Sequence, residues 1–373
     1  MSETELVSRR SIPVPGSSCN VRLGQGAIAV LGSALKAAVG RPHRALFVVE
    51  EGVAPELEEL ARRELSNEGF EYVRCDVPAG PAARTLASVH GLYEELDAAR
   101  ITADDIILAV GDVDALCACA YVAHGWCGGV MLGIVPTTLA AALDPVLSPR
   151  GLDLGASEQV IACEGHPRVM ACDLSQMSIA EGEGAALARA IMVATATADG
   201  ERPFGSLGER AADVLAGDMQ AVHDQMLETL RSRGRLSSSN ARAVRQSLLY
   251  GTTFARALGT LVPELPESLR LSEGLRFTSR VAVGVPEGGD VELVFAQDAL
   301  LDRMGLPEQG IDVDPQALVQ ALREECLRTS SRFMLALPHQ LGKVRLTNVS
   351  EELLEEHAQA WCAARRALAN MAG

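Results

Sequence analysis

Short apolar runs alternate with longer stretches of helical periodicity along the first half of the chain. Runs rich in apolar and β-branched residues occur at 45–49, 72–77 and 105–110. Stretches with helical periodicity lie between them at 56–65 and 85–98. Strict alternation of strands and helices is typical of a parallel sheet covered by helices. We therefore predict that residues 1–178 form an α/β domain with a parallel sheet.

The remainder of the chain, residues 179–373, has a helical pattern almost throughout. Its amphipathic stretches lie at 183–198, 210–232, 240–260, 268–282, 314–327 and 350–370. A late apolar run at 333–337 fits either a short strand or a buried turn of helix, because periodicity does not separate the two. We predict an all-α second domain.

The composition is that of a globular chain with an acidic surface. The 373 residues are 48% hydrophobic, which is enough for a sizeable core. No apolar run reaches the ~18 residues that cross a bilayer. The formal net charge of -16 opposes the phosphate backbone of nucleic acids. We expect neither a membrane nor a nucleic acid as a partner.

The cysteines and the N-terminal segment indicate an intracellular compartment. Nine cysteines, an odd number, are scattered along the chain without a disulfide-like spacing. The first sixteen residues lack the charged-then-apolar order of a secretory signal. We expect reduced thiols and a cytoplasmic location.

Several segments follow one another in an order that is typical of one enzyme family. They are GQGAIAVLG at 24–32, VVEEGVAP at 48–55, PAGPAART at 78–85, AVGDVDAL at 109–116, IVPTTLAAALD at 134–144 and LLYGTTFARAL at 248–258. Their order and spacing resemble the 3-dehydroquinate synthase family. The resemblance covers most of the chain and implies a Rossmann-like nucleotide-binding domain followed by a helical domain. It also implies a homodimer.

The resemblance implies an NAD site at the carboxyl edge of the sheet, with the pyrophosphate on a glycine-rich turn that opens a helix. Its cofactor-binding positions fall here on Glu50, Gly80, Arg84, Gly111, Asp112, Thr137 and Thr138. Asp112 replaces a glycine of the family, and its carboxylate would repel phosphate. We therefore expect weakened NAD binding. Thr137 and Thr138 could contact the cofactor or cap the helix after Pro136.

The family's reaction requires a divalent metal held by one glutamate and two histidines. In this chain the three positions hold Arg189, Arg256 and Ser272, or Leu271 if the register slips by one residue. A guanidinium has no lone pair to offer a metal ion and does not deprotonate in proteins. We therefore predict that the family's metal site is absent.

The arginines at these positions suggest a different ligand. Asp144 and Arg150 stand at catalytic positions of the family, with Arg150 in place of a lysine. Together with Arg189 and Arg256, Arg150 could line a cleft between the domains and bind an anionic small molecule. In the alternative interpretation, Arg189 and Arg256 pair with nearby acids such as Glu273 and close that cleft.

One other group of residues has the composition of a metal site. Cys117, Cys119, His124 and Cys127 lie close together in the sequence, and three of them could share one face of a helix. Cys119 would not join that face. The simpler interpretation is a cysteine-rich helix buried against the sheet.

Three functions are consistent with these patterns. The first is a 3-dehydroquinate synthase-like protein without synthase activity that acts as a ligand-binding or regulatory protein. The second is a related NAD-dependent polyol or alcohol dehydrogenase with altered chemistry. The third is a working 3-dehydroquinate synthase of the shikimate pathway, which cyclises a heptulosonate phosphate with relocated metal ligands.

Overall fold

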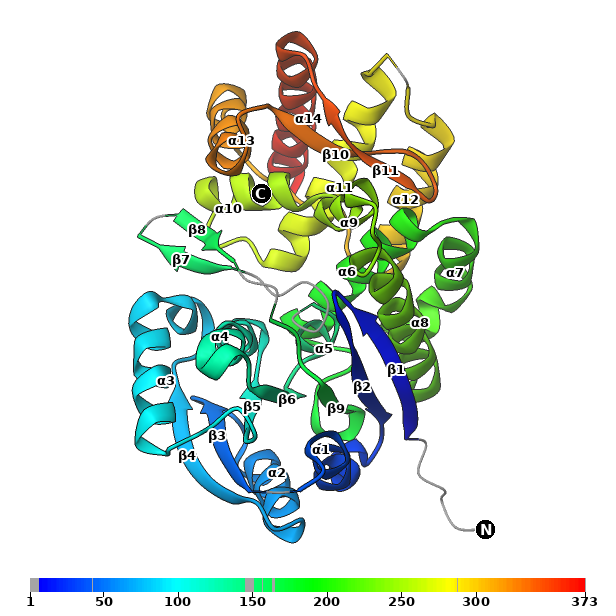
Figure 1. The fold of residues 1–373 in the computed structure, drawn as a ribbon. Coiled ribbons are helices and arrows are strands. Elements are labelled where there is room, and N and C mark those ends of the chain that lie inside the picture. The colour runs from blue at the N-terminus through cyan, green and yellow to red at the C-terminus, as the bar shows by residue number, and fades with distance from the viewer. Residues whose placement is uncertain are drawn as a thin grey trace. The chain divides into compact units, whose positions relative to one another are not determined.

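A computed structural model describes residues 7–41, 43–144, 151–155, 157–162, 165–286 and 288–372 (Figure 1). The chain divides into two compact units, Met1–Ile179 and Ala180–Gly373. None of the helices in the described ranges combines the length and apolar composition needed to cross a membrane.

The first unit is built on a seven-stranded sheet with the strand order β1-β2-β9-β6-β5-β3-β4 (Figure 1). The strands are β1 (Ser8–Val14), β2 (Ser17–Gly24), β3 (Arg44–Glu50), β4 (Glu71–Val77), β5 (Ile106–Gly111), β6 (Met131–Pro136) and β9 (Val169–Asp173). Neighbours from β2 to β4 pair in parallel, and β1 pairs antiparallel with β2. The predicted parallel α/β domain is therefore confirmed, and the edge strand β1 is an addition.

Helices cover both faces of this sheet. They are α1 (Leu31–Val39), α2 (Pro55–Asn67), α3 (Leu86–Ala98), α4 (Val113–Gly125) and α5 (Leu139–Leu143), with short 3-10 turns η1 (Ala27–Val30), η2 (Gly80–Arg84), η3 (Trp126–Gly128) and η4 (Leu174–Gln176). Phe47 of β3 packs in one core with Leu35 of α1 and Leu65 of α2. The preceding residue, Leu46, faces the other side of the sheet and is also fully buried. Helix α4 packs against β5 and β6. A short hairpin, β7 (Leu152–Leu154) and β8 (Ser157–Ile161), completes this unit.

Over its described residues, the second unit is helical apart from one hairpin. Its helices are α6 (Glu183–Asp199), α7 (Glu201–Leu215), α8 (Met219–Ser237), α9 (Arg242–Arg245), α10 (Thr252–Leu261), α11 (Glu267–Gly284), α12 (Val291–Arg303), α13 (Pro315–Thr329) and α14 (Glu351–Ala372). Phe254 of α10 stacks on Phe277 of α11 at 4.5 Å between ring centroids and meets Trp361 of α14 edge-on at 5.1 Å. The helical second domain is confirmed. The ambiguous run at 333–337 belongs to strand β10 (Met334–Gln340), which pairs antiparallel with β11 (Lys343–Asn348).

Two glycines divide helices that the pattern predicted as continuous. The stretch 240–260 consists of α9, a 3-10 turn η5 (Gln246–Leu249) and α10, which begins after Gly251 at φ 78°. A Cβ at Gly251 would lie 2.9 Å from Leu275 Cδ2, so the break also makes room for α11. Gly217, at φ 74°, separates α7 from α8 in the same way. Helix α12 was not predicted.

Candidate functional site

Three adjacent parallel strands end at, or directly before, positions assigned to the cofactor site. β3 ends at Glu50, β5 at Gly111 and β6 at Pro136. Carboxyl ends of neighbouring parallel strands meet at one edge of a sheet, which is where α/β proteins commonly bind ligands. The structure connects Glu50, Asp112 and Thr138 at this edge: the Glu50 carboxylate bonds to the backbone of Asp112, and the Thr138 hydroxyl bonds to its side chain.

Glu50 lies under the turn that follows β5. Its Oε2 accepts a hydrogen bond from the Asp112 amide at 2.5 Å, and its Oε1 accepts one from the Gly80 amide at 3.2 Å. The side chain is buried. Desolvation raises the pKa of Glu50 above its usual value, although the two backbone hydrogen bonds act to lower it. Glu50 therefore satisfies backbone donors of its own unit.

Gly111 is required by the position of Glu50. A Cβ at residue 111 would lie 2.9 Å from both Cβ and Oε2 of Glu50 and 3.1 Å from Cβ of Ala115. These distances are shorter than normal van der Waals contacts. The two Cβ atoms are fixed by the backbone, and Oε2 is held by its hydrogen bond to the Asp112 amide. The glycine of this turn thus accommodates a carboxylate of the chain itself.

Asp112 is the N-cap of α4. Its Oδ1 accepts hydrogen bonds from the Val113 amide at 2.8 Å and from the Thr138 hydroxyl at 2.7 Å. An aspartate at an N-cap satisfies a donor that lacks an intrahelical partner and interacts favourably with the helix dipole. The carboxylate lies at the start of the helix, where the resemblance implied a phosphate.

The two threonines after β6 have different surroundings. Thr138 is the N-cap of α5, since its Oγ1 accepts a hydrogen bond from the Ala141 amide at 3.1 Å while its hydroxyl donates to Asp112. Thr137 contributes a backbone hydrogen bond from its amide to the Gly111 carbonyl at 3.0 Å. Of the two alternatives for this pair, Thr138 has the contacts of a helix cap.

Arg84 is held between two carboxylates. It closes the 3-10 turn η2, and only 5% of the residue is exposed. Its Nε lies 3.3 Å from Asp114 Oδ1, and its Nη2 lies 3.4 Å from Asp153 Oδ2. Asp153 belongs to β7, so this buried cation ties the β7–β8 hairpin to the carboxyl edge. No motif had indicated Asp153 as its partner.

The two positions assigned to catalysis are only partly described. Asp144 is buried and forms the C-cap of α5, with its amide bonded to the Ala140 carbonyl at 3.0 Å. Arg150 lies outside the described residues.

Arg189, which the resemblance aligns with a metal-binding glutamate, is buried inside the second unit. Its Nε donates to the Met304 carbonyl and its Nη1 donates to the Ala180 carbonyl, both at 2.8 Å. Burial lowers the pKa of Arg189 from its usual value, and the negative charge of Glu183 acts to raise it. The guanidinium thus joins α6 to the residue after α12, Met304, and to Ala180, which precedes α6 in the chain.

The other two ligand positions also have local partners. Arg256 Nη1 lies 3.4 Å from Glu325 Oε1. Ser272 is fully buried, and its hydroxyl donates to the Leu269 carbonyl at 2.9 Å within α11. Leu271, the alternative if the register slips, is a buried apolar residue.

Glu273, suggested as a partner of these arginines, is bonded to α14. Its Oε2 accepts hydrogen bonds from Arg365 Nε and Trp361 Nε1, both at 2.8 Å. Both Glu273 and Arg365 are buried, and Arg365 also meets Glu308 at 3.0 Å. This carboxylate is part of the packing of α11 against α14.

Curated proteins that share one name, 3-dehydroquinate synthase, match the chain over most of its length. A 3-dehydroquinate synthase from Symbiobacterium thermophilum is 25% identical over 334 residues, which cover 88% of this chain and 93% of that protein. A second, from Rippkaea orientalis, is 22% identical over 365 residues and covers 92% and 96% of the two chains. The chain is a homologue of the 3-dehydroquinate synthases. No protein-family profile matches it.

Solved structures share the fold of this 3-dehydroquinate synthase homologue. A 2-deoxy-scyllo-inosose synthase complexed with carbaglucose-6-phosphate, NAD+ and Co2+ superimposes with a TM-score of 0.83 at 17% identity, covering 95% of this chain and 100% of that one. A 2-epi-5-epi-valiolone synthase from Streptomyces hygroscopicus with NAD+ and Zn2+ bound has a TM-score of 0.78 at 16% identity, covering 95% and 99%. At these identities the likeness establishes the fold.

The cysteine-rich segment forms the buried helix α4 of the homologue. Cys117 and Cys119 are buried, and burial raises the pKa of the Cys119 thiol. Cys127 is exposed in the turn after the helix, where its φ is 49°. Among the described residues no group of three or more His, Cys, Asp and Glu side chains has the arrangement of a metal site.

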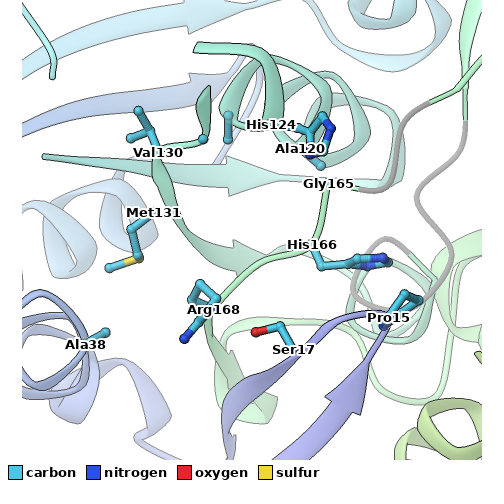
Figure 2. Close-up of a pocket in the computed structure, with 12 residues that line it drawn as sticks. Pro15, Ser17, Ala38, Ala120, His124, Val130, Met131, Gly165, His166 and Arg168 are labelled. Carbon is cyan, nitrogen blue, oxygen red and sulfur yellow. The ribbon is translucent and has the colours of Figure 1, made fainter. Parts of the chain in front are cut away.

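A cavity of about 400 Å³ lies at the opposite, amino edge of the sheet (Figure 2). Met131 begins β6 and Arg168 directly precedes β9, which places the cavity at the start of these strands. Figure 2 shows the side chains of His124, His166, Arg168 and Ser17 around it. No motif spacing in the sequence indicated this group, because its members come from three separate segments.

Proposed function

We propose that this protein is a 3-dehydroquinate synthase homologue that does not carry out the metal-dependent cyclisation of a heptulosonate phosphate. The contacts of Arg189 are the main support for this proposal. Its guanidinium donates to the Met304 and Ala180 carbonyls, so the position of a metal-binding glutamate holds a cation that is part of the packing of the second unit.

The chemistry of the donor set supports the same conclusion. The guanidiniums of Arg189 and Arg256 have no lone pair to coordinate a divalent cation. The Ser272 hydroxyl donates a hydrogen bond within its own helix. A guanidinium about 4 Å from a dication would cost several kcal/mol at an effective dielectric near 20. The residues at these three positions therefore do not fit the Co2+ or Zn2+ of the two synthase structures.

Activity and metal content can be measured together on the purified full chain. The protein would be incubated with NAD, Zn²⁺ or Co²⁺ and the heptulosonate phosphate, and released phosphate would be followed, with the Symbiobacterium thermophilum relative as the active reference. We expect no turnover above background and no metal retained after gel filtration, as measured by plasma mass spectrometry. Chelator-sensitive phosphate release would overturn the proposal in favour of a working synthase.

The dehydrogenase alternative has its own readout. Polyols and primary alcohols would be offered with NAD and Zn²⁺ or Fe²⁺, and NADH formation would be followed by its absorbance. We expect none. Substrate-dependent NADH formation by the purified chain would instead support an NAD-dependent polyol or alcohol dehydrogenase with an altered site.

The cavity at the amino edge favours a second candidate function, the binding of a small anion. Its lining includes Arg168, His124, His166 and Ser17, in a chain of net charge -16. A guanidinium with nearby imidazole and hydroxyl donors is suited to a phosphate or a carboxylate.

Titration calorimetry with inorganic phosphate and with a hexose phosphate tests this second candidate. We expect binding that weakens at least fivefold in Arg168→Ala and is unchanged in Arg63→Ala, which removes an exposed arginine from α2, away from the cavity. The absence of heat from both anions, or an equal loss in the two variants, would rule out the cavity as an anion site.

A further inference from the structure

The turn between β5 and α4 has the position of an anion site in parallel α/β proteins. Ligands of such folds bind outside the carboxyl ends of the strands, and backbone amides at a helix N-terminus attract negative groups. Helix α4, thirteen residues long, begins at this edge directly after Gly111 and Asp112.

We propose that the carboxylates of Glu50 and Asp112 take the place of a bound phosphate at this turn, and that Asp112 is the residue that excludes dinucleotides. Two backbone amides at this turn already donate to carboxylates of the chain. The Asp112 amide donates to Glu50 Oε2 at 2.5 Å, and the Val113 amide donates to Asp112 Oδ1 at 2.8 Å.

Two further donors at the edge, one hydroxyl and one backbone amide, are engaged by the same two carboxylates. The Thr138 hydroxyl donates to Asp112 Oδ1 at 2.7 Å, and the Gly80 amide donates to Glu50 Oε1 at 3.2 Å. The nearby cation, Arg84, lies between Asp114 and Asp153. A phosphate at this turn would have to displace one of these partners.

Space at the turn is filled as well. Gly111 is the glycine that could let a phosphate approach the backbone. The Glu50 side chain packs against it, and Glu50 Oε2 would lie 2.9 Å from a Cβ at residue 111. The Glu50 carboxylate therefore occupies the volume that the missing side chain leaves open.

The local field opposes a further anion. Desolvation raises the pKa of Glu50, and the charges of Asp112 and Asp114 raise it further, which means that three carboxylates already repel one another at this edge. The NAD+ held by the two synthase structures carries a pyrophosphate. The residues at this turn do not fit that group.

This inference concerns the first unit and does not depend on the metal-ligand positions of the second. Binding of NAD to the purified full chain, measured by titration calorimetry, separates it from the proposal about turnover. Three variants are informative. Asp112→Asn removes the charge but keeps one acceptor oxygen, the kind of atom that receives both hydrogen bonds of the cap. The other two are the double variant Asp112→Gly with Val113→Gly, and Asp104→Asn, which removes one exposed charge at the opposite edge.

We expect no saturable NAD binding by the wild-type chain or by Asp104→Asn at millimolar concentrations. Asp112→Asn should gain affinity at least tenfold, and the double glycine variant should gain at least as much. Thermal melts of each variant confirm that it is folded. Micromolar binding of NAD by the wild-type chain, or no gain in either Asp112 variant, would overturn the assignment.

Discussion

The Thr138 hydroxyl donates a 2.7 Å hydrogen bond to Asp112 Oδ1 and so joins the N-terminus of α5 to that of α4. The two residues are the N-caps of helices that follow adjacent parallel strands, β6 and β5. Each cap accepts a hydrogen bond from the first turn of its own helix. The carboxyl edge is therefore held together by polar groups of the chain itself.

Replacing Thr138 by Val should destabilise the first unit by about 1–2 kcal/mol, because it removes the cap of α5 and a hydrogen bond to a carboxylate. Thermal or urea unfolding measures the change. The matched control is Thr137→Val, which alters the neighbouring residue while leaving its backbone hydrogen bond to Gly111 intact. Equal effects of the two substitutions would contradict the role given to Thr138.

Asp105 organises the amino edge of the same sheet. It is buried and accepts hydrogen bonds from the Thr102 amide and hydroxyl, both at 2.7 Å, and from the Arg44 amide at 2.9 Å. Its Oδ1 also lies 2.8 Å from His43 Nδ1. Burial acts to raise the pKa of Asp105, but these hydrogen bonds outweigh it and hold the pKa below its usual value.

We predict that Asp105→Asn lowers the stability of the protein by about 2 kcal/mol near neutral pH. The contribution of Asp105 is present above the pKa of an unfolded aspartate, about 3.9, and is lost as the pH falls through the lower folded-state pKa. The difference between wild type and variant should therefore be constant above about pH 5 and shrink in acid. Urea unfolding at several pH values checks this, and a difference that grows in acid would contradict it.

Arg189→Glu introduces the carboxylate that the resemblance implies at this position and places it against the Met304 and Ala180 carbonyl oxygens. The substitution removes two buried hydrogen bonds and introduces an unpaired buried charge, so we expect a loss of about 3–5 kcal/mol. Arg202→Glu makes the same charge change at an exposed position of α7 and should cost less than about 1 kcal/mol. Similar melting temperatures for the two variants would show that Arg189 is not a packing residue.

Adjacent arginines of α14 allow a buried ion pair to be compared with an exposed one. Arg365 pairs with Glu273, and both residues are buried, whereas Arg366 pairs with Asp312 at 2.7 Å with half or more of each side chain exposed. We predict that Glu273→Gln lowers the free energy of unfolding by about 3 kcal/mol, because the buried Arg365 guanidinium loses the negative charge of Glu273. Asp312→Asn should cost between about 0 and 1 kcal/mol. Thermal unfolding of the two variants tests the contrast, which would fail if Asp312→Asn were the more damaging.

The fold could be predicted wherever local pattern and long-range packing agree. Apolar runs such as 105–110 alternate with helical stretches, and only a parallel sheet with helices on both faces buries them all. Prediction was incomplete where local pattern was weak. The largely exposed strand β1 has few apolar residues, and the run at 333–337 became a strand only through its pairing with β11.

The sequence alone determined the chemistry of single positions. From the order of its motifs we predict that Arg189, Arg256 and Ser272 stand at metal-ligand positions of the related synthases and that Asp112 stands at a glycine position. Only the tertiary structure decided what those side chains bond to. Glu50 meets the Asp112 amide across 62 residues of sequence, and Arg189 meets Met304 across 115. Such partners depend on how strands and helices pack, and no local spacing contains that information.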